Sequence, residues 1–161
     1  MTDRILVVGL GNPDRGDDGV GPAVVAQLQA RVPDSVRLTT RAGDLLTMLG
    51  EWSGLDVLVC IDAAASMGMP GRVHRFDVSS EPLPRDLSAP ASSHALGLAD
   101  TLAMGRVLDL LPPTVIVFAI EGETFETGAS LSDVAASAVG EAVAMVAAEL
   151  HRLARLERAD A

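Results

Sequence analysis

The stretch GLGNPDRGDDGVGP, residues 9–22, decides more of the fold than any other part of the chain. It follows an apolar run and leads into an amphipathic pattern over residues 20–31. This order predicts a buried strand over residues 4–8, then a glycine-rich loop, then a helix over residues 20–31. The loop would therefore bring two adjacent carboxylates, Asp17 and Asp18, to the place where the helix begins.

Two further apolar runs predict buried strands, LDVLVCI at residues 55–61 and TVIVFAI at residues 114–120. Weaker patterns predict short or edge strands at 35–40 and 71–78, a helical turn or two at 45–49 and a loop at 79–93. They also predict a helix over 94–110 and a last helix. The last helix would begin near Ser130 or Ser132, where Ser130 to Asp133 approximates a capping box. Strands that alternate with helices predict an α/β fold. We expect a three-layer sandwich, in which a mostly parallel, twisted sheet carries helices on both faces.

The composition predicts one soluble domain that spans residues 1–161. Hydrophobic residues make up 48% of the chain, yet no apolar stretch approaches the ~20 residues that a membrane span needs. The first residues lack the layout of a secretory signal, and the single cysteine, Cys60, lies in an apolar run. We expect a cytoplasmic monomer without membrane contact, whose residues from about 155 to 161 form a frayed tail.

The net charge of −10 argues against nucleic acid as a partner. The chain has 12 Lys plus Arg against 22 Asp plus Glu, whereas phosphate binding needs a basic face. Aromatic residues make up only 2% of the chain, so platforms for base stacking are also not expected.

Polar side chains follow each of the three strongly apolar strands. Asp17 and Asp18 come after the first, Asp62 ends the second, and Glu121 follows the third. Because the carboxyl ends of parallel strands meet at one edge of a sheet, we expect these side chains to gather there. His94, which follows the Ser/Pro-rich loop, could join them.

The glycine-rich loop resembles a nucleotide cradle, but its charges argue against one. Gly9 and Gly11 fit the start of a G-x-G-x-x-G fingerprint. Pro13, however, has no amide to donate, and the aspartates of the loop would face a polyanion. The chain also contains no lysine, which excludes a P-loop.

A cation suits these residues better. Two carboxylates and one imidazole, from Asp18, Asp62 and His94, are suitable ligands for nickel, zinc or a similar divalent ion. Each residue also has an ordinary structural explanation, since Asp18 or His94 could cap a helix and Asp62 could form an Asx turn. Their convergence at one edge of the sheet favours a metal site.

Three segments of the chain resemble the hydrogenase maturation proteases, the endopeptidases that trim the large subunit of nickel-iron hydrogenases: GLGNPDRGDDGVGP, VCIDA at 59–63 and SHALGL at 93–98. They match a G-x-G-N loop with an acidic D-[DE]-x-x-G element, an Asp that closes a buried strand, and a Ser-x-His element. The resemblance extends to residues 123–132, which lead into the last helix. It implies a phosphorylase/hydrolase-like fold, a twisted sheet between helices.

The resemblance also implies a substrate. Asp18, Asp62 and His94 would contact nickel that is already inserted in the precursor of a hydrogenase large subunit, and a short C-terminal peptide would then be released. The precursor is thus the implied partner. Nickel arrives with it, and no stored organic cofactor is expected.

Metal-assisted hydrolysis is the catalytic hypothesis that remains, because the chain has no H-E-x-x-H motif and no evident Ser-His-Asp or Cys-His set. Asp18 or Asp62 would help to position the scissile carbonyl or a water. Asn12 could bind the substrate backbone, although a turn bond is an equal alternative. Gly43 is a second candidate substrate contact, in a loop that reads RAGD where family members carry Gly-Gly-Thr/Ser.

Two other functions stay open at this point. Peptidyl-tRNA hydrolases have a similar fold and also begin with G-L-G-N-P, but their catalytic His-Asn pair has no counterpart before His74, and the acidic charge opposes tRNA binding. A nickel-sensing assembly chaperone without protease activity could use the same pocket, and the sequence does not distinguish it from an enzyme.

Overall fold

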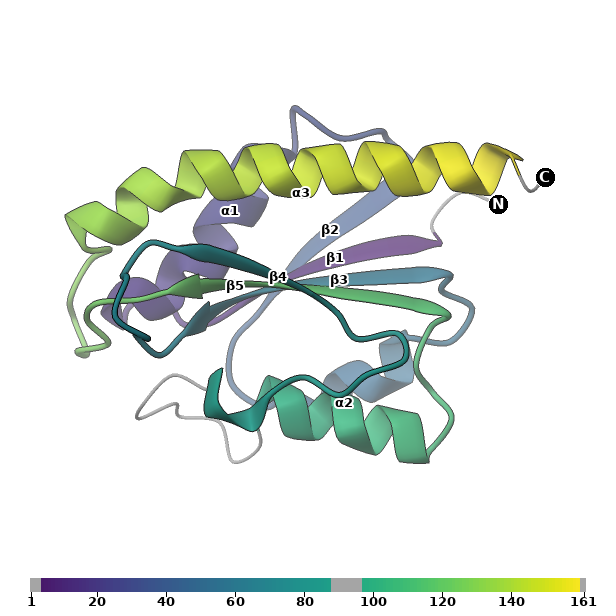
Figure 1. Cartoon of the computed structure of the whole chain (residues 1–161), viewed down its shortest axis with the longest axis horizontal. Helices are drawn as coiled ribbons and strands as arrows, with labels where there is room; N and C mark the ends of the chain where they lie inside the picture. The colour runs from purple at the N-terminus through teal and green to yellow at the C-terminus, as the bar shows by residue number, and fades with distance from the viewer. Residues whose placement is uncertain (1–3, 88–96, 160–161) are drawn as a thin grey trace.

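A five-stranded sheet forms the centre of the molecule, in the order β2-β1-β3-β5-β4 (Figure 1). The computed structural model describes residues 4–87 and 97–159. The elements along these residues are β1 (Ile5–Leu10), η1 (Gly16–Gly19), α1 (Val20–Leu28), β2 (Val36–Arg41), η2 (Leu46–Glu51), β3 (Val57–Ala64), β4 (Val73–Asp77), η3 (Arg85–Leu87), α2 (Leu98–Val107), β5 (Thr114–Glu121) and α3 (Asp133–Ala159), where η marks a 3-10 helix. All neighbouring strands are parallel except β4, which runs antiparallel to β5.

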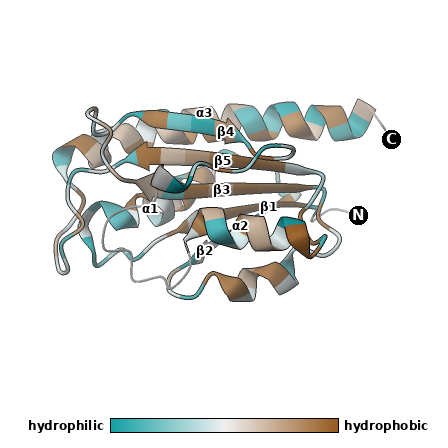
Figure 2. Ribbon diagram, turned by 60° about the horizontal axis from the view of Figure 1, so that its bottom comes forward, coloured by the Kyte–Doolittle hydropathy of each residue, from teal (hydrophilic) through white to brown (hydrophobic). Residues whose placement is uncertain are grey.

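The three central strands are the apolar runs of the sequence. Every residue of β1 is buried, and so are nearly all residues of β3 and β5. The outer strands β2 and β4 mix buried, half-buried and exposed positions, as the weaker alternation of their sequences predicts. Figure 2 shows this contrast, with hydrophobic residues along most of β1, β3 and β5.

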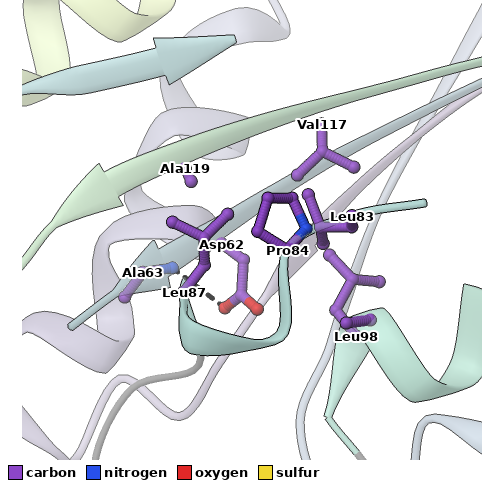
Figure 3. Close-up of a pocket in the computed structure, with 9 residues that line it drawn as sticks. Asp62, Ala63, Leu83, Pro84, Leu87, Leu98, Val117 and Ala119 are labelled. Atoms are coloured by element: carbon purple, nitrogen blue, oxygen red, sulfur yellow. Dashed lines mark hydrogen bonds between the residues drawn. The ribbon is translucent and has the colours of Figure 1, made fainter. Parts of the chain in front are cut away.

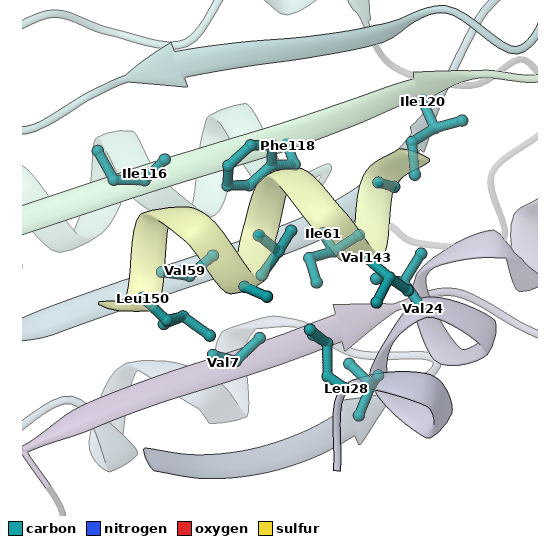
Figure 4. Packing of buried hydrophobic residues seen from close by; sticks show 14 of the residues in the cluster. Val7, Val24, Leu28, Val59, Ile61, Ile116, Phe118, Ile120, Val143 and Leu150 are labelled. Atoms are coloured by element: carbon teal, nitrogen blue, oxygen red, sulfur yellow. The ribbon is translucent and has the colours of Figure 1, made fainter. Parts of the chain in front are cut away.

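Helices cover both faces of the sheet and enclose two hydrophobic cores. Helices α1 and α3 lie on one face, and α2 with η2 lies on the other (Figure 1). The larger core joins α1 and α3 to inward-facing residues of the central strands, and Figure 4 shows its packing: Val7, Val24, Leu28, Val59, Ile61, Ile116, Phe118, Ile120, Val143 and Leu150. The predicted α/β sandwich with helices on both faces is therefore confirmed.

Some element boundaries differ from the prediction. Helix α2 spans Leu98–Val107, whereas the predicted helix reached residue 110; residues 94–96 of that prediction lie outside the described residues. Helix α3 begins at Asp133 and is capped by Ser132, whose Oγ accepts the N–H of Ala135 at 3.2 Å. The predicted helix start near Ser132 is confirmed, whereas the capping box from Ser130 is wrong, because the side chain of Ser132 makes the cap. The helix is regular as far as Ala159, through most of the predicted tail.

Helix α3 is the one described helix that is long and apolar enough to cross a membrane, with a mean hydropathy of 1.3 over its most apolar window. The sequence had suggested that no segment meets this criterion. Half of that window is buried inside the molecule, where α3 packs on α1 and the sheet. A buried apolar stripe of this kind is typical of a core helix.

Candidate functional site

The glycine-rich loop places the start of α1 directly against the ends of β1 and β3. Gly11 has a φ of +129°, and a side chain there would overlap the carbonyl of Asp18. A Cβ on Gly21 would come within 2.5 Å of the carbonyl oxygens of Leu10 and Ile61. These glycines let the backbone of the first helical turn touch the strand ends, which brings η1 and its two aspartates to the carboxyl edge of the sheet.

Asp18 lies on η1 with 5% of its surface exposed. Its Oδ2 accepts the N–H of Asn12 at 2.8 Å, so the carboxylate is fixed to the loop that carries it. The guanidinium of Arg15 lies 4.0 Å from the same oxygen. Asp18 is thus a buried, oriented carboxylate at the end of β1.

Asp62 lies near the end of β3 and forms part of the wall of a pocket (Figure 3). The rest of the lining is almost wholly apolar: Ala63, Leu83, Pro84, Leu87, Leu98, Ala99, Val117 and Ala119. The carboxylate of Asp62 accepts the N–H of the next residue, Ala63, at 2.9 Å. Burial, together with the negative charge of Asp18, raises the pKa of Asp62 to about 7. The structure therefore brings Asp18 and Asp62 within electrostatic range, as the sequence predicted.

Asp17 has a different role from its neighbour. It is completely buried, and its carboxylate accepts four hydrogen bonds: from the N–H groups of Glu123 (2.7 Å), Thr124 (3.2 Å) and Ser132 (2.7 Å), and from Ser132 Oγ (2.8 Å). Burial opposes ionisation, but these hydrogen bonds outweigh it and lower the pKa of Asp17. Asp17 joins η1 to the segment between β5 and α3, and this clamp explains why residues 123–132 belong to the sequence pattern.

Glu121 ends β5 and is also tied down. Only 1% of it is exposed, and its Oε1 accepts the N–H groups of Met67 (2.7 Å) and Met69 (3.1 Å). Its Oε2 lies 2.7 Å from Nε2 of His74. Burial opposes the charge, yet the hydrogen bonds from His74 and from the two N–H groups lower the pKa of Glu121. Glu121 therefore reaches the predicted edge but binds the connection between β3 and β4.

His74 is the residue of this edge that the sequence analysis missed. It lies on β4 opposite Ala119 of β5, which in turn pairs with Asp62 of β3, so the three side chains belong to one face of the sheet. The register between β4 and β5 places His74 beside Glu121. The one feature of the sequence that could have identified His74 is a polar imidazole in an otherwise strand-like segment.

The two candidate substrate contacts lie in loops at the same edge. Asn12 uses its side-chain oxygen to accept the N–H of Asp14 at 2.9 Å, which is the turn bond that the sequence left as an alternative. Gly43 follows β2 with a φ of +87° and open space around it. Asp44 next to it accepts the N–H of Leu46 at the start of η2. Neither observation bears on substrate binding.

The donor set can be compared with what a divalent ion needs. His94 lies outside the described residues, and within residues 4–87 and 97–159 no three His, Cys, Asp or Glu side chains are grouped closely enough to hold a metal ion. Asp18 and Asp62 are close enough for the charge of Asp18 to raise the pKa of Asp62, and a proton or a cation near Asp62 would reduce this repulsion. The residues present fit a borderline divalent ion that a third ligand would complete.

Cys60, by contrast, is a core residue. Its side chain is fully buried in β3, and burial raises the pKa of its thiol. A raised pKa leaves the thiol protonated and unreactive. This agrees with the absence of a Cys-His set in the sequence analysis.

Known proteins share both the sequence and the fold of this chain. The family model described as HycI, hydrogenase maturation protease, matches residues 22–149. Hydrogenase 2 maturation protease of Escherichia coli (strain K12) is 29% identical over 150 residues, which cover 91% of this chain and 90% of that protein. An endopeptidase from Escherichia coli, solved in solution, has a TM-score of 0.80 at 27% identity and covers 92% of this chain and 93% of its own. The [NiFe] hydrogenase maturation protease HybD from Thermococcus kodakarensis has a TM-score of 0.70 at 26% identity, with coverage of 89% and 96%.

The match extends over most of the chain in sequence and over nearly all of it in structure. The similar proteins are described as proteases or endopeptidases, so the activity class is that of a peptidase. The chain belongs to the hydrogenase maturation protease family.

Proposed function

We propose that this peptidase removes a C-terminal peptide from the nickel-loaded precursor of a nickel-iron hydrogenase large subunit. The precursor is its protein partner, and nickel arrives with the precursor as part of the substrate. The enzyme stores no organic cofactor and acts in the cytoplasm as a monomer.

The observation that supports this proposal most is the pair formed by Asp18 and Asp62. One carboxylate is oriented by the N–H of Asn12, and the other lies in an apolar pocket with a pKa of about 7. A divalent cation between them would relieve their repulsion and displace the proton of Asp62. The imidazole of His94 is the third ligand that we propose.

These ligands suit an ion that must leave with the product. Carboxylate and imidazole groups bind nickel with moderate strength, whereas a set of thiolates would retain it. When bound, such an ion polarises a carbonyl or a water. In the complex with the precursor, Asp62 would bind the ion as an ionised carboxylate, and Asp18 or Asp62 would help to position the scissile carbonyl or a water.

The direct test is cleavage of a nickel-loaded large-subunit precursor, followed by mass spectrometry of its C-terminus. We expect wild-type protein to remove the extension, and Asp18→Asn, Asp62→Asn and His94→Ala to lose this activity. Asp109→Asn is the matched control. Asp109 is an exposed carboxylate after α2 with a φ of 57°, a conformation that Asn tolerates.

Each result has a clear meaning. Cleavage that requires nickel, persists in Asp109→Asn and disappears in the three site variants supports the proposal. Normal cleavage by all three site variants would refute the site. Nickel-dependent binding of the precursor by the wild type without cleavage would instead favour the assembly chaperone. Release of peptide from peptidyl-tRNA would favour a function like that of the peptidyl-tRNA hydrolases.

A further inference from the structure

The connection between β3 and β4 exposes two large apolar side chains beside the pocket of Asp62. This connection, residues 65–72, begins three residues after Asp62. Met67 is 49% exposed and Met69 is 60% exposed. Single exposed apolar residues are common on protein surfaces, but two on one short loop next to a pocket form a local apolar surface.

The backbone of this connection is held firmly in place. The N–H groups of Met67 and Met69 both donate to Oε1 of the buried Glu121, and the N–H of Gly71 donates to its carbonyl at 2.7 Å. The Glu121 N–H donates in return to the carbonyl of Arg72 at 3.0 Å. The exposed methionine side chains therefore extend from a fixed backbone.

A buried carboxylate is a costly way to close a turn, because it must be removed from water and then fully hydrogen-bonded. Glu121 meets that requirement through the two loop N–H groups and His74. This arrangement fixes the positions of Met67 and Met69 while leaving their side chains in solvent. Unbranched, polarisable methionine side chains adapt to apolar partners of different shape.

The loop is continuous with the pocket wall. The N–H of Ala65 donates to the carbonyl of Leu87 at 3.2 Å, and Leu87 lines the pocket together with Asp62. Across the sheet, Ala119 lies between Asp62 and His74 and also lines the pocket. A polypeptide whose scissile bond lay at Asp62 would therefore meet the methionine loop within a few residues of that bond.

We infer that Met67 and Met69 form an apolar contact surface for the polypeptide substrate, next to the bond that is cleaved, and that Glu121 is the residue that positions them. This inference rests on the proposed protease function. The occupant is the precursor chain, because the surface continues the pocket in which its cleavage is proposed.

The test is the kinetics of precursor cleavage by the double variant M67Q/M69Q. Glutamine has nearly the length of methionine but is polar, so contact with an apolar side chain is lost without an overlap. We expect KM to rise about tenfold, because apolar contact with the substrate is lost, while kcat stays within about twofold. The conservative variant M67L/M69L should keep the wild-type KM.

The matched control is Leu156→Gln. Leu156 is 50% exposed on α3, on the opposite face of the sheet, and its replacement should leave KM unchanged. A double variant M67Q/M69Q with the KM of the wild type would overturn the inference. So would an equal rise of KM in Leu156→Gln, which would show a general effect of surface polarity.

The positioning role of Glu121 has its own readout. Glu121→Gln should raise KM on its own, but added to M67Q/M69Q it should raise KM no further, because the residues act through one contact. Fully additive effects would contradict this role.

Failure of the proposed protease function can be distinguished from failure of the methionine contact. If wild-type protein does not cleave the nickel-loaded precursor, the protease function fails, and the affinity of that precursor for wild type and for M67Q/M69Q then decides the contact. Weaker binding by the double variant supports the methionine surface, and equal binding refutes it.

Discussion

Two aspartates at the same edge of the sheet, the buried Asp17 and the half-buried Asp62, differ sharply in their surroundings. Asp17 receives four hydrogen bonds from the segment before α3, and its pKa is lowered. Asp62 receives one from the described part of the chain, that of its neighbour Ala63, and its pKa is raised to about 7. The first carboxylate is satisfied by the protein, whereas the second leaves room for a proton or a cation. The comparison shows that hydrogen bonds, rather than burial alone, decide whether the pKa of a carboxylate at this edge is lowered or raised.

The largest expected effect comes from the unsatisfied carboxylate. Asp62→Asn should lower kcat/KM for precursor cleavage by roughly 10²-fold or more, because it removes a proposed ligand of the ion. Its thermal stability should be unchanged or higher, since the repulsion with Asp18 disappears. Cleavage kinetics measure the expected loss of activity, and thermal denaturation measures the stability. A variant that loses stability along with activity would contradict the assignment.

The opposite pattern is expected for the satisfied carboxylate. Asp17→Asn places an NH₂ group where N–H donors now point, so the free energy of unfolding should fall by about 2–4 kcal/mol. Chemical denaturation measures this loss. Asp133→Asn, at an exposed position in the first turn of α3, is the control and should cost only a few tenths of a kcal/mol. Equal losses in both variants would argue against the clamp.

The raised pKa of Asp62 predicts a pH dependence of stability in the nickel-free protein. The folded protein holds a proton that the unfolded chain releases at the ordinary value of 3.8, so the contribution of Asp62 to stability falls as pH rises from about 4 to about 7. Melting temperatures with a chelator present, for wild type and Asp62→Asn, test this sign. The stability of the variant relative to wild type should increase with pH over that range, and a constant difference would refute it.

A smaller loss of stability is expected when Ser132, a hydrogen-bond partner of Asp17, is replaced. Ser132→Ala removes both the helix cap on Ala135 and the hydroxyl bond to Asp17, and should cost about 1–2 kcal/mol of unfolding free energy. Ser137→Ala, at an exposed position inside α3, is the control and should not destabilise. If both serine variants keep wild-type stability, the cap contributes nothing.

The sequence was sufficient to predict the sheet and the approach of Asp18 to Asp62, since parallel strands must end at one edge and both residues follow apolar strands. It could not predict the pairing of His74 with Glu121, because that pairing depends on the register of an antiparallel strand. It also selected Asp18 as the ligand but assigned no role of its own to Asp17. Their difference depends on a backbone segment more than a hundred residues away, which local patterns do not encode.

The clamp at Asp17 has a consequence for how the protein is made. Its partners Glu123 and Ser132 lie 106 and 115 positions further along the chain, so the loop that carries Asp18 is fixed only after most of the polypeptide has left the ribosome. Closing a loop of this length costs chain entropy and slows folding. A nascent or truncated chain without these residues would lack the hydrogen bonds that join η1 to the segment before α3. The protein would thus gain its ability to act on another protein only once its own synthesis was nearly complete.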